Sequence, residues 1–313
     1  MLRFLSLLGG RGVTLLFVGV FLGLAVPGLA VLLRPLLATS VVLLLFFSLL
    51  RVDWLSILGH LKRPLLTTLL VAWMLLGSPV LTWVLSSNLP IPQSLTTAVI
   101  LMAAAPPILG STAIALLLGL DGALALVVGL ISTMLAPLTI PPLAFWLLNL
   151  ELEVGTWELM LRLSAIVVPA LIGALIVRRW LGREWLRTNA VAIDGTIVLV
   201  MLIFAIGVMD GVTLTMIERP GIVALWLFVS FIANPALQMV TILIFWSLGR
   251  RLAFTAGLLA GNCNMGLLLA ALPASADYDV VLYFAIAQIP MYVLPALTKP
   301  IYRRLLVQMH SAT

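Results

Sequence analysis

Long apolar runs, separated by short polar or charged stretches, fill almost the whole of the 313-residue chain. Most runs reach the roughly 20 residues that an α-helix needs to cross the hydrocarbon core of a bilayer. The pattern predicts ten membrane-spanning helices, over residues 13–33, 36–52, 65–86, 93–119, 122–149, 157–177, 190–209, 221–248, 253–273 and 279–302. The polar remainder leaves no room for an extramembrane domain, so we expect an all-α integral membrane protein.

The second half of the chain repeats the proline pattern of the first half. The matched pairs are Pro27 and Pro169, Pro79 and Pro235, and Pro137 and Pro295. Each half then holds five crossings, and an odd number inserts the second copy upside down, as in many secondary transporters. We therefore expect residues 1–150 and 151–313 to form two inverted five-helix repeats. The first two helices meet tightly at Arg34-Pro35, whereas a long basic loop is expected at 178–189 between helices six and seven.

Composition and charge agree with a lipid environment. Apolar residues make up 63% of the chain, charged residues 9%, and the mean hydropathy is +1.26, which is typical of a membrane protein. The net charge of +6 could suggest a nucleic-acid partner, but 14 of the 17 Lys and Arg residues fall on one side of the ten-helix topology. Only Arg34, Arg162 and Arg219 fall on the other side. The positive-inside rule then places both termini in the cytoplasm, and we expect a bacterial inner membrane and no nucleic-acid partner.

Several classes of chemistry lack the residues that they need. The single Cys263 cannot form an intrachain disulfide, and the two histidines, His60 and His310, lie in a basic loop and in the polar tail. No cluster of metal-ligating residues and no phosphate-binding glycine loop is present. We therefore expect no cofactor, no metal and no direct use of ATP. An intramembrane enzyme would need an acid pair, a Ser/Lys dyad or a metal cluster, and none is visible.

The fourth expected helix contains a strong helix-breaking signal. Adjacent Pro106 and Pro107 remove two backbone donors and push the preceding residues out of helical geometry. Ser111 and Thr112 follow within two turns. The sequence therefore predicts a broken helix four, with polar groups next to the break.

The ninth expected helix contains a second helix-breaking signal, at the position of the second repeat that corresponds to the break in helix four. Gly261, Asn262, Cys263 and Asn264 follow one another there, and Gly and Asn are poor helix formers whose amides carry hydrogen bonds. Breaks at equivalent positions of inverted halves indicate the central site of a transporter. The alternative is that the prolines only kink helix four, that the glycines only pack helices, and that Cys263 only fills space.

A few further polar residues lie inside expected spans. Asn234 and Gln238 share one face of helix eight and could line a cavity or bond across helices, and Gln288 lies in helix ten. Asp194, near the start of helix seven, either carries protons or lies at the interface as a cap, and we favour the interface. The candidate substrate- or ion-binding residues are Pro106, Pro107, Ser111, Thr112, Asn234, Gln238, Gly261, Asn262, Cys263, Asn264 and Gln288.

The residues around the two breaks resemble a known family. The motifs are Pro-Pro at 106–107, Gly-Ser-Thr at 110–112, Gly-Leu-Asp-Gly at 119–122, Ser-Thr-Met-Leu-Ala-Pro at 132–137 and Asn-Cys-Asn-Met-Gly at 262–266. Residues 103–143 resemble helices four and five, and residues 261–269 resemble helix nine, of the bile acid:sodium symporter family. The auxin efflux carriers are similar neighbours of that family.

The resemblance implies an architecture and a mode of action. Helices three to five and eight to ten would form a core domain, and helices one, two, six and seven a panel domain. Broken helices four and nine would cross near the midplane, with the substrate in a crevice between core and panel. The family implies secondary active transport by alternating access.

The family's sodium ligands are largely replaced in this chain. The resemblance places Ser111 and Thr112 at a Ser-Asn pair, Leu259 at a Glu, Cys263 at a Gln, Ala125 and Gly129 at two hydroxyls, and Met74 at the Gln of helix three. Loss of the one carboxylate removes the group that neutralises the ion in a low-dielectric site. We expect a carrier of a small organic solute, an organic anion, that does not use these sodium sites. The alternative within transport is a sodium-independent exporter similar to the auxin efflux carriers.

Overall fold

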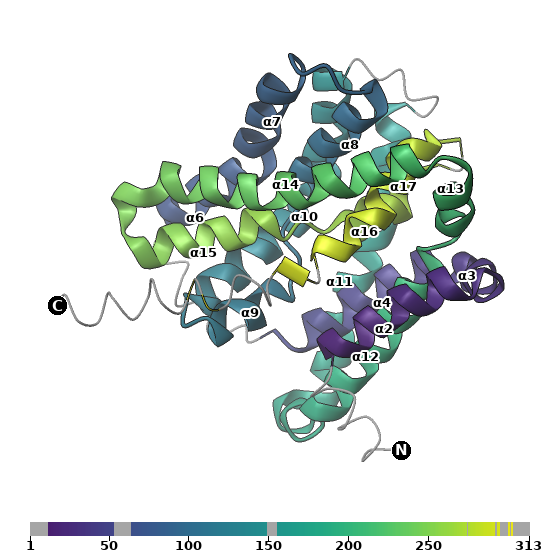
Figure 1. Cartoon of the computed structure of the whole chain (residues 1–313). Helices are drawn as coiled ribbons and strands as arrows, with labels where there is room; N and C mark the ends of the chain where they lie inside the picture. Colours follow the sequence, from purple (N-terminus) through teal and green to yellow (C-terminus); the bar gives the residue numbers. More distant parts are fainter. Residues whose placement is uncertain are drawn as a thin grey trace.

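The computed structural model describes residues 12–52, 64–148, 155–273, 275–291, 293–294, 300 and 302. In these residues all regular secondary structure is helical, apart from one isolated β-bridge (Figure 1). The predicted boundary between repeats at 150 and 151 and the basic residues of both termini and of the 53–63 segment lie outside the described residues.

Six helical stretches of the described chain are long and apolar enough to cross a membrane. They are Pro27–Leu50, Pro64–Ser86, Gly122–Leu148, Thr156–Thr188, Ala190–Glu218 and Pro220–Leu248. Gln93–Ala104 and Tyr278–Met291 are shorter apolar helices, and the first of these ends at a predicted break. These lengths and compositions confirm an all-helical membrane protein.

One group of helices packs around α12, and we call it the α12 group. Its members are α2 (Gly12–Ala25), α3 (Pro27–Leu33), the 3₁₀ turn η1 (Arg34–Leu36), α4 (Leu37–Leu50), α11 (Thr156–Thr188) and α12 (Ala190–Gly207). Helix α12 packs against both α2 and α4, and α11 packs along α4 (Figure 1). Gly23 allows the close approach of α2, since a Cβ there would lie 2.7 Å from the carbonyl oxygen of Ile206.

The remaining helices form the second group. Its members are α6 (Pro64–Ala72), η2 (Trp73–Gly77), α7 (Ser78–Ser86), α8 (Gln93–Ala104), α9 (Ser111–Leu117), α10 (Gly122–Leu148), α14 (Pro220–Phe245), η3 (Trp246–Leu248), α15 (Arg250–Gly261), α16 (Met265–Ala271) and α17 (Tyr278–Ile286). Helix α14 lies along α15, α7 lies along α8, and α17 packs on α8. Helix α13 (Val212–Glu218) leads from the first group into α14.

Pro79 changes the local helix type. It lies at the start of α7, directly after the π-helical turn η2. A proline lacks the N–H that bonds four residues back, and its ring crowds that carbonyl, so a widened turn accommodates it. The indole Nε1 of Trp73 in this turn donates a 3.0 Å hydrogen bond to Thr241 Oγ1 of α14. This hydrogen bond therefore links the α6–η2–α7 stretch to α14.

The predicted basic loop at 178–189 is wrong, because α11 continues as a helix to Thr188. The stretch is rich in Arg, Leu, Trp and Glu, which tolerate a helix well. Gly182 interrupts it locally with a φ of +74°, a conformation that glycine adopts without strain. The connection to α12 is therefore a kinked helix that bends at Gly182.

Asp194 does not cap α12, and its position at the membrane interface stays a prediction. The helix begins at Ala190 after Asn189, and the Asp194 carboxylate instead accepts hydrogen bonds of 2.7 and 3.2 Å from Arg51. Both side chains are about two-fifths exposed. An ion pair at the helix ends therefore accounts for this acid.

Candidate functional site

The first break follows directly from the proline pair. Helix α8 ends at Ala104, and Ala105 adopts extended geometry with φ −66° and ψ 138°, which is the conformation that a following proline favours. The chain stays irregular through Gly110, and α9 begins at Ser111. The interruption predicted for the fourth helix is therefore confirmed.

The second break consists of three buried or half-buried residues between α15 and α16. Asn262 and Asn264 leave helical geometry, with ψ values of 63° and 69°. The Asn262 Nδ2 donates a 2.7 Å hydrogen bond back to Leu258 O, and the Asn264 Oδ1 accepts a 3.2 Å bond from the Leu267 N–H. The two amides thus satisfy backbone groups on both sides of the interruption.

The two breaks cross and pair with each other. Ile108 N–H donates to Asn262 O at 2.9 Å, and Asn264 N–H donates to Pro106 O at 2.7 Å. These bonds make Pro107 and Cys263 opposite partners of a short antiparallel bridge. Unpaired backbone groups are costly at membrane depth, so each break satisfies part of the other. The crossing brings polar, non-helical backbone from both halves of the chain to one place.

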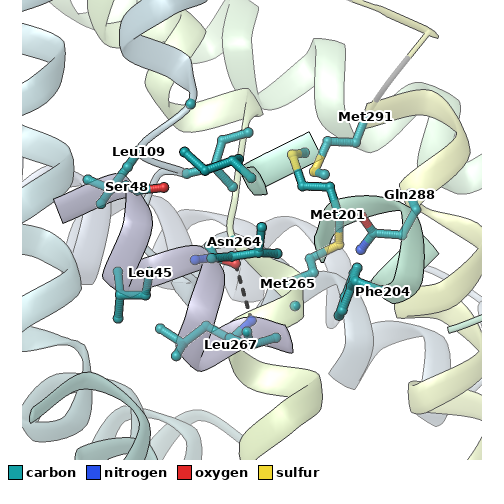
Figure 2. Close-up of a pocket in the computed structure, with 16 residues that line it drawn as sticks. Leu45, Ser48, Leu109, Met201, Phe204, Asn264, Met265, Leu267, Gln288 and Met291 are labelled. Carbon is teal, nitrogen blue, oxygen red and sulfur yellow. Dashed lines mark hydrogen bonds between the residues drawn. The ribbon is translucent and has the colours of Figure 1, made fainter. Parts of the chain in front are cut away.

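A cavity of about 150 Å³ lies next to this crossing. Helices α4 and α12 of the first group line it together with the two breaks, α16 and the Gln288 region of the second group (Figure 2). Its lining residues are Val41, Leu44, Leu45, Ser48, Ile108, Leu109, Gly110, Ile197, Met201, Phe204, Asn264, Met265, Gly266, Leu267, Gln288 and Met291. The lining side chains are mostly apolar, and none of them is charged. In Figure 2, Asn264 is drawn between Ser48 on one side and Gln288 on the other.

Two predicted site residues contribute amides to the cavity wall. Gln288 is 1% exposed, its Nε2 donates to Phe284 O at 3.2 Å, and its Oε1 has no partner among the described residues. Asn264 uses its Oδ1 for the Leu267 N–H, and its Nδ2 donates to no other described residue. An unpaired acceptor and an unpaired donor therefore face the same cavity.

Free backbone donors add to this polar edge. The N–H groups of Leu109, Gly110 and Gly266 make no hydrogen bond within the described part of the chain, and all three residues line the cavity. Leu109 and Gly110 lie in the irregular stretch before α9, and Gly266 lies in the first turn of α16, whose N–H groups lack helical acceptors. The cavity therefore has apolar walls and a cluster of hydrogen-bond donors at the crossing.

The other predicted residues around the first break lie beside the cavity. Pro106 and Pro107 are buried and contribute backbone to the crossing. Ser111 is fully buried, and the hydroxyl oxygens of Ser111 and Thr112 have no hydrogen-bond partner among the described residues. Neither residue is part of the cavity lining.

Asn234, Gln238 and Gly261 are buried away from the cavity. Gln238 packs directly over Gly261, where an added Cβ would overlap the Gln238 side chain, and its Oε1 accepts a 3.2 Å hydrogen bond from Tyr302. Asn234 Nδ2 donates to Ser230 O at 3.3 Å. Of the two roles considered for these amides, bonding across helices applies to Gln238, and neither residue lines the cavity.

Cys263 is buried at the crossing. Its thiol donates to Ala260 O at 3.0 Å, so the space-filling alternative describes its side chain. The cavity lining also includes Ser48 of α4 and Met201 and Phe204 of α12. The resemblance implied a panel domain beside the substrate, but sequence reasoning did not predict these residues. The one available signal was Ser48, an isolated hydroxyl within the apolar run of α4.

The comparison with protein families agrees with this geometry. The model of the sodium bile acid symporter family matches residues 38–217, which include the first break, α4, α11 and α12. No curated protein sequence matches the chain at a significant level. Members of the matched family are transporters and not enzymes, which agrees with the expectation from the sequence. The match covers more than half of the chain, and the chain therefore belongs to the sodium bile acid symporter family.

Proposed function

We propose that the protein is a secondary active transporter that moves a small organic anion across the membrane by alternating access. The observation that carries this proposal is the pairing of the two breaks beside a cavity that α4 and α12 also line. The solute would lie between two helix groups that can move relative to each other. Such motion would expose the cavity first to one side of the membrane and then to the other.

The chemistry of the cavity supports an anionic solute with an apolar body. A carboxylate accepts several hydrogen bonds, and the free N–H groups of Leu109, Gly110 and Gly266, with the Asn264 amide, can donate them. The remaining wall is apolar and fits the rest of the molecule. The unpaired Oε1 of Gln288 would accept a hydrogen bond from a hydroxyl or amide of the solute.

The side chains at the family's sodium positions support transport without sodium. Met74, Ala125 and Leu259 are buried apolar residues in this chain, and the Cys263 thiol is engaged with a backbone carbonyl. A sodium ion needs a cage of oxygen atoms, and an acid that neutralises it is especially valuable in a low-dielectric site. None of these four side chains provides an oxygen.

Helix packing supports two inverted repeats, residues 1–150 and 151–313, with ten spans in total. Helix α14 packs on α15 as α7 packs on α8, and α11 packs on α4 as α12 packs on α2. In this arrangement the α12 group is the panel and the second group is the core. The charge distribution supports a cytoplasmic location for both termini.

Uptake into proteoliposomes tests the proposal. A panel of radiolabelled organic anions with apolar bodies should yield at least one solute that the full chain takes up. The substitution Asn264→Ala should lower that uptake at least about tenfold, because a hydrogen bond to a charged group is lost. The matched control is Asn88→Ala, whose exposed side chain bonds only to Val84 O. Equal uptake by both variants, at equal expression, would remove the cavity from the mechanism.

The same assay separates the coupling ion from the site. Replacing sodium by choline should leave uptake unchanged in the wild type. A steep, saturable dependence on sodium would contradict the sodium-independent mechanism while leaving the cavity assignment intact.

A further inference from the structure

The end of α11 combines exposed cations with exposed aromatic side chains. We call residues 178–188 the α11 extension. Arg179, Arg183 and Arg187 are all exposed there, and so are Trp180 and Trp185, at 82% and 46%. Water alone does not favour large exposed indole rings, so this surface needs an apolar or interfacial neighbour.

The depth of the extension follows from the helix length. Trp157 and Trp180 lie near opposite ends of the straight part of α11, and a rise of about 1.5 Å per residue separates them by about 35 Å. That distance slightly exceeds the roughly 30 Å hydrocarbon core. Trp is enriched at the two boundaries between lipid and water. This spacing places Trp180 at headgroup level, and the α11 extension follows it directly in the chain.

Neighbouring helices fix the base of the extension. The Arg178 Nη1 donates to Leu50 O at 3.1 Å and to Val52 O at 2.8 Å, so it closes the end of α4. Arg51 is engaged by Asp194 at 2.7 Å. These two cations are already used within the α12 group.

The arginines farther along the extension have fewer partners within the protein than Arg178 and Arg51. Arg179 and Arg183 have no acidic partner among the described residues. Arg187 pairs only with Glu184, at 3.1 Å, and both of those side chains are about four-fifths exposed. The extension therefore presents an excess of positive charge at the depth where lipid phosphates lie.

We propose that the α11 extension is a binding site for the headgroups of anionic phospholipids. The guanidinium groups of Arg179 and Arg183 bind the phosphates, for which the planar fork of arginine is well suited. Trp180 and Trp185 insert at the level of the acyl esters. The site holds α11, and with it the α12 group, at a fixed depth in the bilayer.

Lipid selectivity of the full chain in bilayers tests this site. Spin-labelled phosphatidylglycerol and phosphatidylcholine with identical acyl chains are compared by the fraction of each that the protein immobilises. The wild type should prefer phosphatidylglycerol, and Arg183→Gln should lower the preference about fivefold, as expected for the loss of one cation near the membrane surface. Arg187→Gln should have a smaller effect, because Glu184 already neutralises part of that charge.

Two further variants distinguish the site from a general charge effect. Glu184→Gln should raise the preference, since it frees Arg187, and this gain cannot come from misfolding. Arg162→Gln is the matched control, because Arg162 is an exposed arginine of the same helix paired with Glu158 at the opposite end. An equal loss in Arg162→Gln, no gain in Glu184→Gln, or no preference in the wild type would overturn the proposal.

Discussion

Two glycines, Gly257 and Gly261, lie where α15 packs against α14. Replacing either of them by alanine should destabilise the protein, but for different steric reasons. At Gly261 the nearest atoms to an added Cβ all belong to the Gln238 side chain. At Gly257 they include the backbone oxygen of Gln238, at 2.8 Å, and the side chain of Ile242. A side chain can move aside, whereas a helix backbone cannot without separating the two helices.

The expected magnitude follows from overpacking. Gly261→Ala should cost about 1–3 kcal/mol, because Gln238 must leave its position and give up its 3.2 Å hydrogen bond from Tyr302. Gly257→Ala should cost at least as much, although alanine recovers up to about 1 kcal/mol in helix propensity. Losses of this size lower the midpoint of thermal unfolding by a few degrees.

Thermal unfolding in detergent, at one scan rate for all variants, measures these effects in a double-mutant cycle. Gln238→Ala should rescue Gly261→Ala, with a coupling energy of about 1 kcal/mol or more. The same change should not rescue Gly257→Ala. Gly28→Ala is the control for glycine replacement, since nothing lies within 4 Å of its added Cβ.

Additive effects in the Gly261 and Gln238 cycle would refute this reasoning. Equal rescue at Gly257 would refute it as well, because it would mean that the clash there also involves only the Gln238 side chain.

Three other predictions concern the cavity, the ion pair and the topology. Met201→Trp should fill the cavity and abolish uptake, whereas Val191→Trp, at an exposed position of the same helix, should not; uptake at equal expression decides. Asp194→Asn should cost at most about 1 kcal/mol, because its partner Arg51 is half exposed, and it should leave the pH profile of transport unchanged; a flattened profile would make Asp194 a proton carrier. In a background with Cys263→Ser, Arg187→Cys, at an exposed position of the α11 extension, should react with an impermeant maleimide only from the cytoplasmic side, and labelling from outside intact cells would contradict the topology.

Local signals in the sequence predicted the interruptions well. Pro106 and Pro107 act on their own neighbours, so the break at Ala105 follows from steric rules that need no tertiary structure. The run from Gly261 to Asn264 gave a similar local signal. Both breaks were therefore predictable.

Tertiary placement was less predictable. Gln238 and Asn264 are both amides within expected spans. Gln238 packs over Gly261 between α14 and α15, whereas Asn264 lines the cavity. The difference depends on how α14 lies on α15, which no pattern of single residues contains. The lining residues of α4 and α12 were not predicted for the same reason. Apolar residues that face lipid and apolar residues that face a cavity are indistinguishable in sequence.

The basic stretch at 178–189 predicts a loop because of its charge, whereas in the structure α11 continues as a helix to Thr188. Arg, Leu, Trp and Glu all tolerate a helix, and Gly182 stops the helix only locally. The charge pattern predicts that the segment lies at the membrane surface, but it does not determine the backbone conformation.

Cross-linking across the cavity tests alternating access most directly. Leu45 of α4 and Leu267 of α16 both line the cavity and belong to the two different helix groups, and both can be replaced by cysteine in a background with Cys263→Ser. A short bifunctional maleimide that joins the two should abolish uptake in proteoliposomes, while each single-cysteine variant treated in the same way should keep its activity. Uptake at the full rate by the cross-linked protein would contradict the account, because the two helix groups would then have no need to move.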